Sequence, residues 1–423
     1  MSDKVLFTKE MAKEYTILIP EMCPIHFELV KNVLRNGGYK VELLNNSGPE
    51  IVQTGLKYVH NDTCYPAILV IGQMIDALNS GKYDVNKTAL IITQTGGGCR
   101  ASNYIFLLRK ALKKAGLEQV PVISLNVAGL EMQSGFTLDL KAIQSLLASI
   151  VYGDMLMDLS NQCKAYELNH GDSMNTVRKW LNKIAEEFKN NHAYTLKDIK
   201  NNLKIITQDF AAIPLKKENK VKVGIVGEIY IKYSSLGNNN LEQLLDNENC
   251  EIKIPGVLGF GLYCLYNAIE DHKLYGGHLF RLFFIKLAYR YVLKLEQMMI
   301  DAIKENSDFV APSPFNQLIV EASKVIGLGT KMGEGWLLTG EMMELNNSGF
   351  KNIICTQPFG CLPNHIVGKG MIRKIKEIDP TCNITPIDYD PSASSVNQEN
   401  RIKLMLAIAK ESLNSDTTKE GRA

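Results

Sequence analysis

Short apolar runs alternate with amphipathic stretches over the first third of the chain. The apolar runs have strand length and occupy 15–20 (YTILIP), 39–44, 89–95 (ALIITQT) and 121–127 (PVISLNV). Residues at helical spacing fill the gaps, in segments near 24–36, 50–58, 66–78 and 105–115. Strands that alternate with helices predict a parallel, doubly wound α/β lobe, which we bound at 1–137.

The alternation stops near residue 138 and resumes near 216. Residues 138–215 have helical periodicity with no clear strand, which predicts a helical connector. Strand-like runs then return at 222–231, 250–255, 351–357 and 383–390. They predict a second α/β lobe over 216–414 that carries its own helical insertion, with helices near 261–306, 315–326 and 335–345. Ser395 with Gln398 fits a capping box at the start of the last helix, and the polar segment 415–423 is expected to fray.

Composition narrows the class of protein. A chain of 423 residues is too long for one ordinary core, and its net charge of +2, with both signs interspersed, gives no sign of a nucleic-acid surface. The first residues lack a signal-peptide core, and charged residues interrupt the apolar stretch 279–300. We therefore expect a cytoplasmic protein with no membrane partner, in which the nine cysteines are reduced thiols or metal ligands.

Four cysteines share one setting: Cys23, Cys64, Cys99 and Cys361. Three of them have a proline one or two residues later, and proline is favoured in the first turn of a helix. Three follow directly on a predicted strand, at the edge where open α/β sheets bind ligands. The positive end of a helix dipole lowers a thiol pKa of ~8.5, so this setting favours the thiolates that ligate iron or zinc.

The segment TQTGGGCRASNY (93–104) is a glycine loop between a strand and a helix, and it ends in Cys99 and Arg100. Gly97 and Gly98, like Gly360 before Cys361, would let the backbone approach a bulky inorganic ligand. A nucleotide phosphate is the alternative ligand, but the loop lacks the lysine and hydroxyl residue that handle phosphate and magnesium.

Other residues near these cysteines are weaker candidates. His365 lies one turn after Cys361, where it is either a proton donor or an ordinary histidine at a helix start. Arg100 either pairs with an anionic group or has a structural role, and Glu228 ends an apolar strand, where a carboxylate is either paired or functional. Cys23 with His26 could also form half of a zinc site. The remaining cysteines, among them Cys163, Cys250, Cys264, Cys355 and Cys382, are expected to be small buried hydrophobes.

Six motifs together resemble a known family. They are EMCPIH, NDTCYPA, GGGCR, GEIY, QPFGCLPNH and ASSVNQENR. In order and spacing they resemble the acyl-CoA dehydratase activase-related proteins, within the superfamily of 2-hydroxyacyl-CoA dehydratase components and double-cubane cluster proteins. The resemblance covers nearly the whole chain and is strongest from Gly333 to Arg401.

The resemblance implies two Rossmann-like lobes around an iron–sulfur cluster, which is a 4Fe–4S cluster or, alternatively, a double-cubane 8Fe–9S cluster. Its ligand candidates are Cys23, Cys64, Cys99 and Cys361. A partner that hydrolyses ATP and has its own cluster would deliver single electrons at low potential. The chain, as one half of a dimer, would then reduce a small molecule or reductively dehydrate an acyl-CoA.

The sequence also departs from the family pattern. A dehydratase cluster commonly has three cysteine ligands and an open iron, whereas this chain offers four candidates, and a double cubane would need about six. Four candidates could close the site or leave one cysteine spare. A closed site would favour a second hypothesis, a non-catalytic electron-transfer or scaffold subunit. A zinc-stabilised or nucleotide-binding α/β protein is a third. Whether the chain is an enzyme stays open at this stage.

Overall fold

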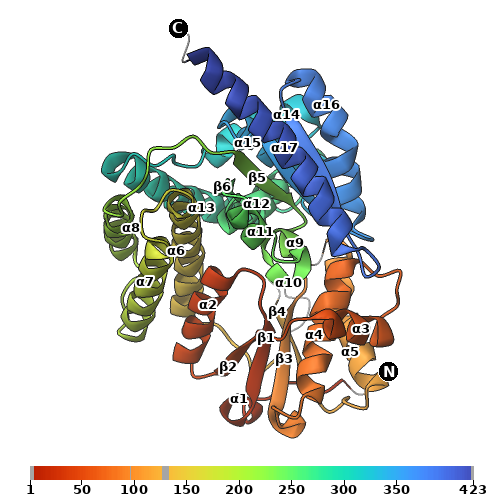
Figure 1. Ribbon diagram of the computed structural model, residues 1–423. Coiled ribbons are helices and arrows are strands. Elements are labelled where there is room, and N and C mark those ends of the chain that lie inside the picture. The colour runs from red at the N-terminus through yellow and green to blue at the C-terminus, as the bar shows by residue number, and fades with distance from the viewer. Residues whose placement is uncertain (1–3, 96, 126–132, 421–423) are drawn as a thin grey trace.

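The computed structural model describes residues 4–95, 97–125 and 133–420, and it is a mixed α/β protein with two separate parallel sheets (Figure 1). The first sheet has the order β2-β1-β3-β4, formed by β1 (Thr16–Pro20), β2 (Lys40–Leu44), β3 (Thr88–Thr93) and β4 (Val122–Leu125). The second has the order β6-β5-β7-β8, formed by β5 (Lys222–Gly227), β6 (Glu251–Lys253), β7 (Asn352–Pro358) and β8 (Asn383–Tyr389). The expectation of two doubly wound lobes is confirmed, and both sheets have the same topology.

Helices flank the sheets in both lobes. Around the first sheet are α1 (Met11–Glu14), α2 (Pro24–Asn36), α3 (Pro49–Tyr58), α4 (Tyr65–Asn79) and α5 (Tyr104–Lys114), with the short turns η1 (Val85–Lys87) and η2 (Arg100–Asn103). The second lobe has α9 (Ile229–Tyr233), α10 (Ser235–Asn238), α11 (Leu241–Asn247), α15 (Gly335–Asn347), η3 (Asn364–Gly368), η4 (Lys369–Met371), α16 (Ile372–Ile378) and α17 (Ser395–Glu420).

The remaining helices form a third body beside the two lobes, and α6, α7, α8 and α13 of this body lie on the left in Figure 1. Its members are α6 (Leu140–Lys164), α7 (Asp172–Lys189), α8 (Leu196–Ala211), α12 (Val257–Tyr275), α13 (Leu279–Asn306) and α14 (Phe315–Val325). The predicted connector and the predicted insertion thus share one core, which contains both tryptophans, Trp180 and Trp336. Helix α6 is long and apolar enough to cross a membrane, but 67% of its most apolar window is buried, so it packs as a core helix.

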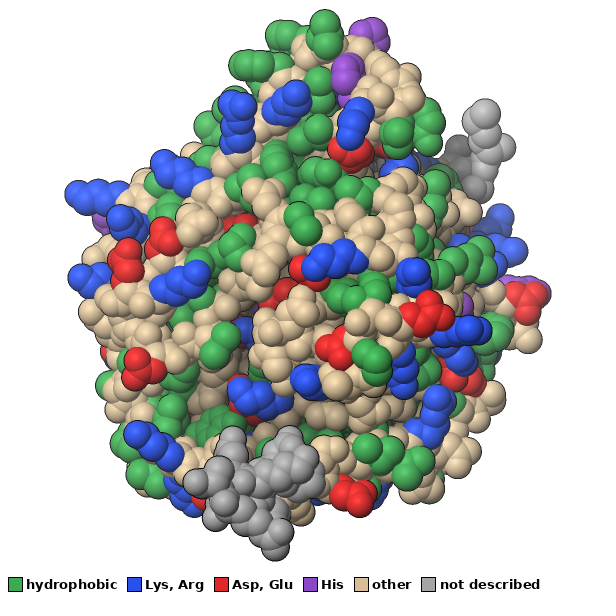
Figure 2. Space-filling view, turned by 90° about the horizontal axis from the view of Figure 1, so that it is seen from above, with side chains coloured by type: hydrophobic (Ala, Val, Ile, Leu, Met, Phe, Trp, Pro, Cys, Tyr) green, Lys and Arg blue, Asp and Glu red, His purple; other side chains and the backbone are tan. Residues whose placement is uncertain are grey.

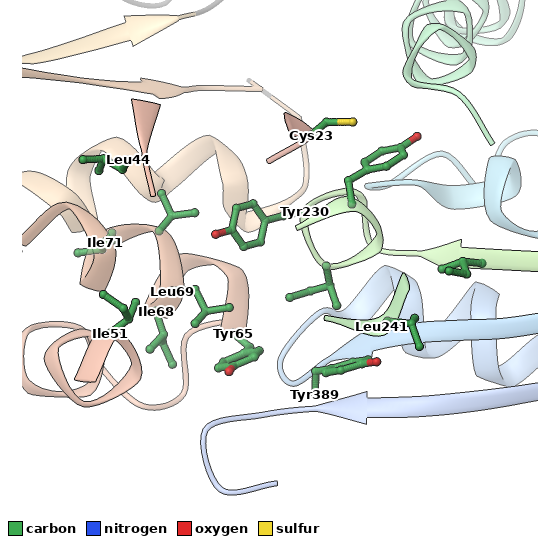
Figure 3. Close-up of a cluster of buried hydrophobic side chains, with 14 of the residues drawn as sticks. Cys23, Leu44, Ile51, Tyr65, Ile68, Leu69, Ile71, Tyr230, Leu241 and Tyr389 are labelled. Atoms are coloured by element: carbon green, nitrogen blue, oxygen red, sulfur yellow. The ribbon is translucent and has the colours of Figure 1, made fainter. Parts of the chain in front are cut away.

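A single apolar core joins the two lobes (Figure 3). Leu69 and Tyr65 of α4 lie on one side of it, and Tyr230 of α9 and Tyr389 of β8 lie on the other. Because this core is shared, the carboxyl ends of the two sheets are held together across the junction between the lobes.

Three details differ from the sequence-based expectations. The strand predicted over 222–231 ends at Gly227. Only glycine fits there, because φ is +142° and the Cβ of any other residue would collide with Thr356 Oγ1. The predicted capping box does not form, because the Gln398 amide instead donates to the Asp388 carbonyl and accepts from Asn239. Helix α17 continues through Glu420, into the segment expected to fray.

Candidate metal centre

Most of the candidate residues lie at the topological switch point of a sheet, where the strand order reverses. In each sheet the first strand lies between the second and third, so the strand order reverses between β1 and β3 and between β5 and β7, where open α/β sheets bind their ligands. Cys23 and Cys99 follow β1 and β3, while Glu228 and Cys361 follow β5 and β7. Four loops from the two lobes converge there, namely the loops of Cys99, Glu228 and Cys361 and the Cys64 loop before α4.

Cys64 begins this cluster. It is the N-cap of α4, with Pro66 in the first helical turn as the sequence predicts. Its buried Sγ lies 2.8 Å from the hydroxyl of Tyr104, the first residue of α5. Tyr104 escaped the sequence analysis because its only signal was its position, five residues after Cys99.

Gly360 brings the Cys361 turn against the Cys64 loop. Its φ is +73°, and a Cβ built on it would lie 2.9 Å from Cys64 Cα, so only glycine fits. The adjacent Phe359 carbonyl accepts a hydrogen bond of 2.9 Å from Tyr65 N. The two cysteines, almost 300 residues apart in sequence, are therefore fixed beside each other by backbone contacts.

The glycine loop presents Cys99 to the same place. Gly97 faces open space, whereas a Cβ on Gly98 would lie 2.3 Å from Met332 Sδ, so Gly98 lets the loop pack against the segment before α15. Arg100 is exposed and donates from Nη1 to the Asp62 carbonyl at 2.6 Å. The arginine thus joins the Cys99 loop to the loop that precedes Cys64, which is a structural role.

Two buried carboxyl groups complete the cluster. Glu228 is the N-cap of α9 and accepts from Ile231 N at 2.9 Å, and Glu334 accepts from Ile229 N at 3.1 Å. Burial and the neighbouring charge of Glu334 raise the pKa of Glu228 to about 8, and burial raises the pKa of Glu334. Glu334 has no strand or motif beside it in the sequence, but its place between Gly333 and Gly335, both with positive φ, marks a constrained turn.

The thiols carry the opposite pKa shift from the one predicted. Burial raises the pKa of Cys64 to about 11, the Tyr104 hydrogen bond opposes this rise, and the charges of Glu228 and Cys99 add smaller increases. Burial also raises the pKa of Cys99 and of Cys361, and in both cases the charges of Glu334 and Glu228 add to it. The helix-dipole expectation is therefore wrong for these three thiols, because desolvation outweighs the helix N-terminus.

Cys23 has separate partners. Its Sγ lies 2.9 Å from His26 Nδ1, and His26 Nε2 lies 2.8 Å from Asp154 Oδ1 on α6. The Asp154 carboxylate also accepts the Val257 and Leu258 N–H groups at the start of α12. Both ring nitrogens of His26 are thus occupied, and Cys23 is not among the charges that act on the three thiols described above.

The other candidates have ordinary surroundings. His365 is half-buried in η3, and in the described part of the chain its ring has no hydrogen-bond partner. Cys163, Cys250, Cys355 and Cys382 are buried as expected, but Cys264 is exposed, so the expectation of burial is wrong for it.

The chemistry of the donor set fits a cationic centre. Three thiols and two carboxyl groups occupy the interior, and the nearby cation Lys232 is already paired with Glu341 at 3.1 Å. With their pKa values raised, these groups are largely protonated at neutral pH, so a metal ion that bound them would displace their protons. As the described side chains stand, no group of three or more His, Cys, Asp and Glu residues is arranged to hold a metal ion.

No family model matches the chain, and a comparison with curated proteins finds no similar sequence. The family resemblance therefore rests on the motifs alone.

Proposed function

We propose that the chain is an iron–sulfur protein that takes low-potential electrons from an ATP-hydrolysing activator and reduces, or reductively dehydrates, a small-molecule or acyl-CoA substrate. The observation that carries this proposal is the convergence of Cys64, Cys99 and Cys361 from three loops of two lobes beside the buried Glu228 and Glu334. The cytoplasm, where such electron donors work, is its proposed compartment.

Cys64, Cys99 and Cys361 would hold the cluster, and the cluster would supply one-electron chemistry. Three ligands suit a 4Fe–4S cluster with one iron free for substrate, which favours the catalytic hypothesis over a closed electron-transfer centre. Cys23 contacts His26 instead, so it is the least supported of the four sequence candidates.

Glu228 and Glu334 would manage protons at this site. Glu228 and Glu334 are buried close together, so they do not both ionise readily and one of them retains a proton near neutral pH. A retained proton can be given to a substrate that gains an electron, and the Tyr104 hydroxyl beside Cys64 offers a second donor.

Iron and sulfide per chain after anaerobic reconstitution test the proposal. Cys64→Ala, Cys99→Ala and Cys361→Ala should each lower the iron content severalfold, while the matched control Cys163→Ala, a buried cysteine of the helical body, should retain it. About four irons per chain would fit a single cubane and about eight a double cubane.

A colourless, iron-free protein after reconstitution would refute the proposal. Unchanged iron in all three variants would refute the ligand assignment alone. If the cluster forms but its spectrum does not change when acyl-CoA or small reducible ligands are added, the result favours the electron-transfer hypothesis.

A further inference from the structure

The hairpin formed by the end of α12 and the start of α13 leaves the helical body. The two helices are anchored at their far ends, where Leu262 of α12 and Leu295 of α13 are fully buried. Between these anchors, residues 273–281 are all exposed. We call residues 273–290 the hairpin tip.

The hairpin tip exposes a run of large apolar side chains, and outside the tip the Lys331 ammonium lies 5.8 Å from the centroid of the Tyr275 ring. The exposed residues are Leu274, Tyr275, Leu279, Phe280, Phe283, Phe284 and Leu287. Tyr275 is 79% exposed and Phe280 is 76% exposed. The phenylalanine rings contact one another, with centroids 4.8 Å apart for Phe280 and Phe284 and 5.5 Å for Phe283 and Phe284. Exposed apolar surface of this extent marks an interaction site.

Positive charge borders this apolar stripe. From His272 to Leu295 the sequence has five Lys and Arg residues and no acidic residue: Lys273, Arg281, Lys286, Arg290 and Lys294. At 100° per residue, positions 279 to 287 of α13 place the apolar side chains on one face, with Arg281 on one flank and Lys286 on the other. Arg290 lies on the same face, about one turn beyond Leu287. Among the described residues these three cations form no ion pair.

The charge pattern decides between possible occupants. A second copy of the chain would bring its own Arg281, Lys286 and Arg290 against the same residues with no carboxylate to offset them, so self-association is disfavoured. The occupant must therefore be anionic as well as able to accept apolar side chains.

The shape of the tip favours a lipid surface over an acidic protein. Gly276 and Gly277, with φ of +75° and +140°, make a narrow turn, so the tip is convex and offers no groove to a partner. Figure 2 shows hydrophobic side chains gathered with Lys, Arg and His on a projection of the molecule. Aromatic rings with cations on both flanks suit the bilayer interface, where rings enter the headgroup layer and cations reach the phosphates.

We propose that the hairpin tip docks on an anionic lipid surface and holds the protein there reversibly. The contact is peripheral, because the apolar part of α13 covers about two turns and its other end is packed in protein. The sequence alone predicted no membrane partner, since the charges that interrupt 279–300 exclude a span. The structure adds that the same charges flank an exposed apolar face.

Co-sedimentation of the full chain with vesicles tests this proposal. Vesicles of phosphatidylcholine with phosphatidylserine should bind the protein at low ionic strength, vesicles of phosphatidylcholine alone should bind it weakly, and salt should release it. Arg281→Glu, Lys286→Glu and Arg290→Glu combined should weaken binding by roughly a hundredfold or more, since each basic residue near such a surface contributes ~1 kcal/mol. Phe280→Ser with Phe283→Ser should also release the protein.

Matched controls lie elsewhere on the surface. Lys197→Glu, Lys200→Glu and Lys204→Glu make the same charge change on exposed positions of α8, and Leu404→Ser with Ile408→Ser removes exposed apolar residues from α17. Neither control should alter vesicle binding by more than twofold. No binding to the anionic vesicles, or equal losses in controls and tip variants, would overturn the proposal. So would a dimer, detected by analytical ultracentrifugation, that the phenylalanine variants dissociate, because the tip would then bind a second copy.

Discussion

At the scale of single residues, buried ionisable groups link separate elements and contribute to the stability of the fold. Asp154 connects three elements, because its carboxylate binds His26 of α2 and the first two N–H groups of α12 while it sits on α6. Burial alone would lower the pKa of His26, but the charges of Cys23 and Asp154 raise it to about 10. The pair therefore stabilises the fold fully below the ordinary histidine pKa of 6.5, and this contribution is lost as the pH rises through about 10.

Asp154→Ala should lower the free energy of unfolding by about 3–5 kcal/mol at pH 7, because it leaves His26 and two backbone donors buried without a partner. Asp139→Ala is the matched control, since Asp139 also caps a helix but is exposed, and should cost only about 1 kcal/mol. Urea denaturation of both variants measures the difference. Equal losses would mean that the buried network adds nothing beyond a helix cap.

Glu296 predicts a pH dependence away from the cysteines. It lines a cavity of about 80 Å³ together with Asp154, Asp158 and Glu341, and accepts from Phe315 N at 3.0 Å. Burial raises its pKa from 4.5 to about 7, against the opposing effect of the Phe315 hydrogen bond. Between these two values the folded state binds more protons than the unfolded state, so this group makes stability fall as the pH rises.

Glu296→Gln keeps the acceptor oxygen and removes the titration. The variant should be more stable than the parent by about 1–2 kcal/mol at pH 8 and no more stable at pH 4.5. Thermal unfolding at the two pH values checks this. A stability gain that is the same at both values would show that the carboxyl group does not titrate as described.

At the scale of elements, the turns after the strands decide whether the site can assemble. Gly360 and Gly349 both have positive φ, +73° and +88°, so alanine is strained at either position. Only at Gly360 would the added Cβ meet Cys64. Gly360→Ala should therefore lower both stability and reconstituted iron, whereas Gly349→Ala should lower stability by about 1 kcal/mol and leave the iron content unchanged. If both variants lost iron, the cause would be general instability around β7 and not the contact between Gly360 and Cys64.

At the scale of the whole molecule, the sequence predicts what is periodic or local and misses what is assembled in space. The strands and most helix limits follow from apolar spacing, and Cys64, Cys99 and Cys361 follow from their places after strands or before helices. Glu334 and Tyr104 have no such local signal, because their role depends on loops that meet only in the folded chain. The direction of the thiol pKa shifts was wrong for the same reason, since burial of the cysteines depends on the junction between lobes.

The shared core between the lobes predicts cooperative unfolding of the whole chain. Leu69 of α4 is fully buried at this junction, while both tryptophans belong to the apolar cluster of the helical body, which Trp336 enters from α15 of the second lobe. Leu69→Ala should cost about 2–5 kcal/mol, and the tryptophan fluorescence should report the full loss although no tryptophan belongs to the altered cluster. Leu404→Ala, at an exposed position of α17, should leave the transition in place. If the tryptophan fluorescence of Leu69→Ala kept the parent transition while circular dichroism showed an earlier transition, the first lobe would unfold alone. The four loops of the candidate site would then be held together only while that lobe is folded, and the iron content of Leu69→Ala would fall before its helical body melts.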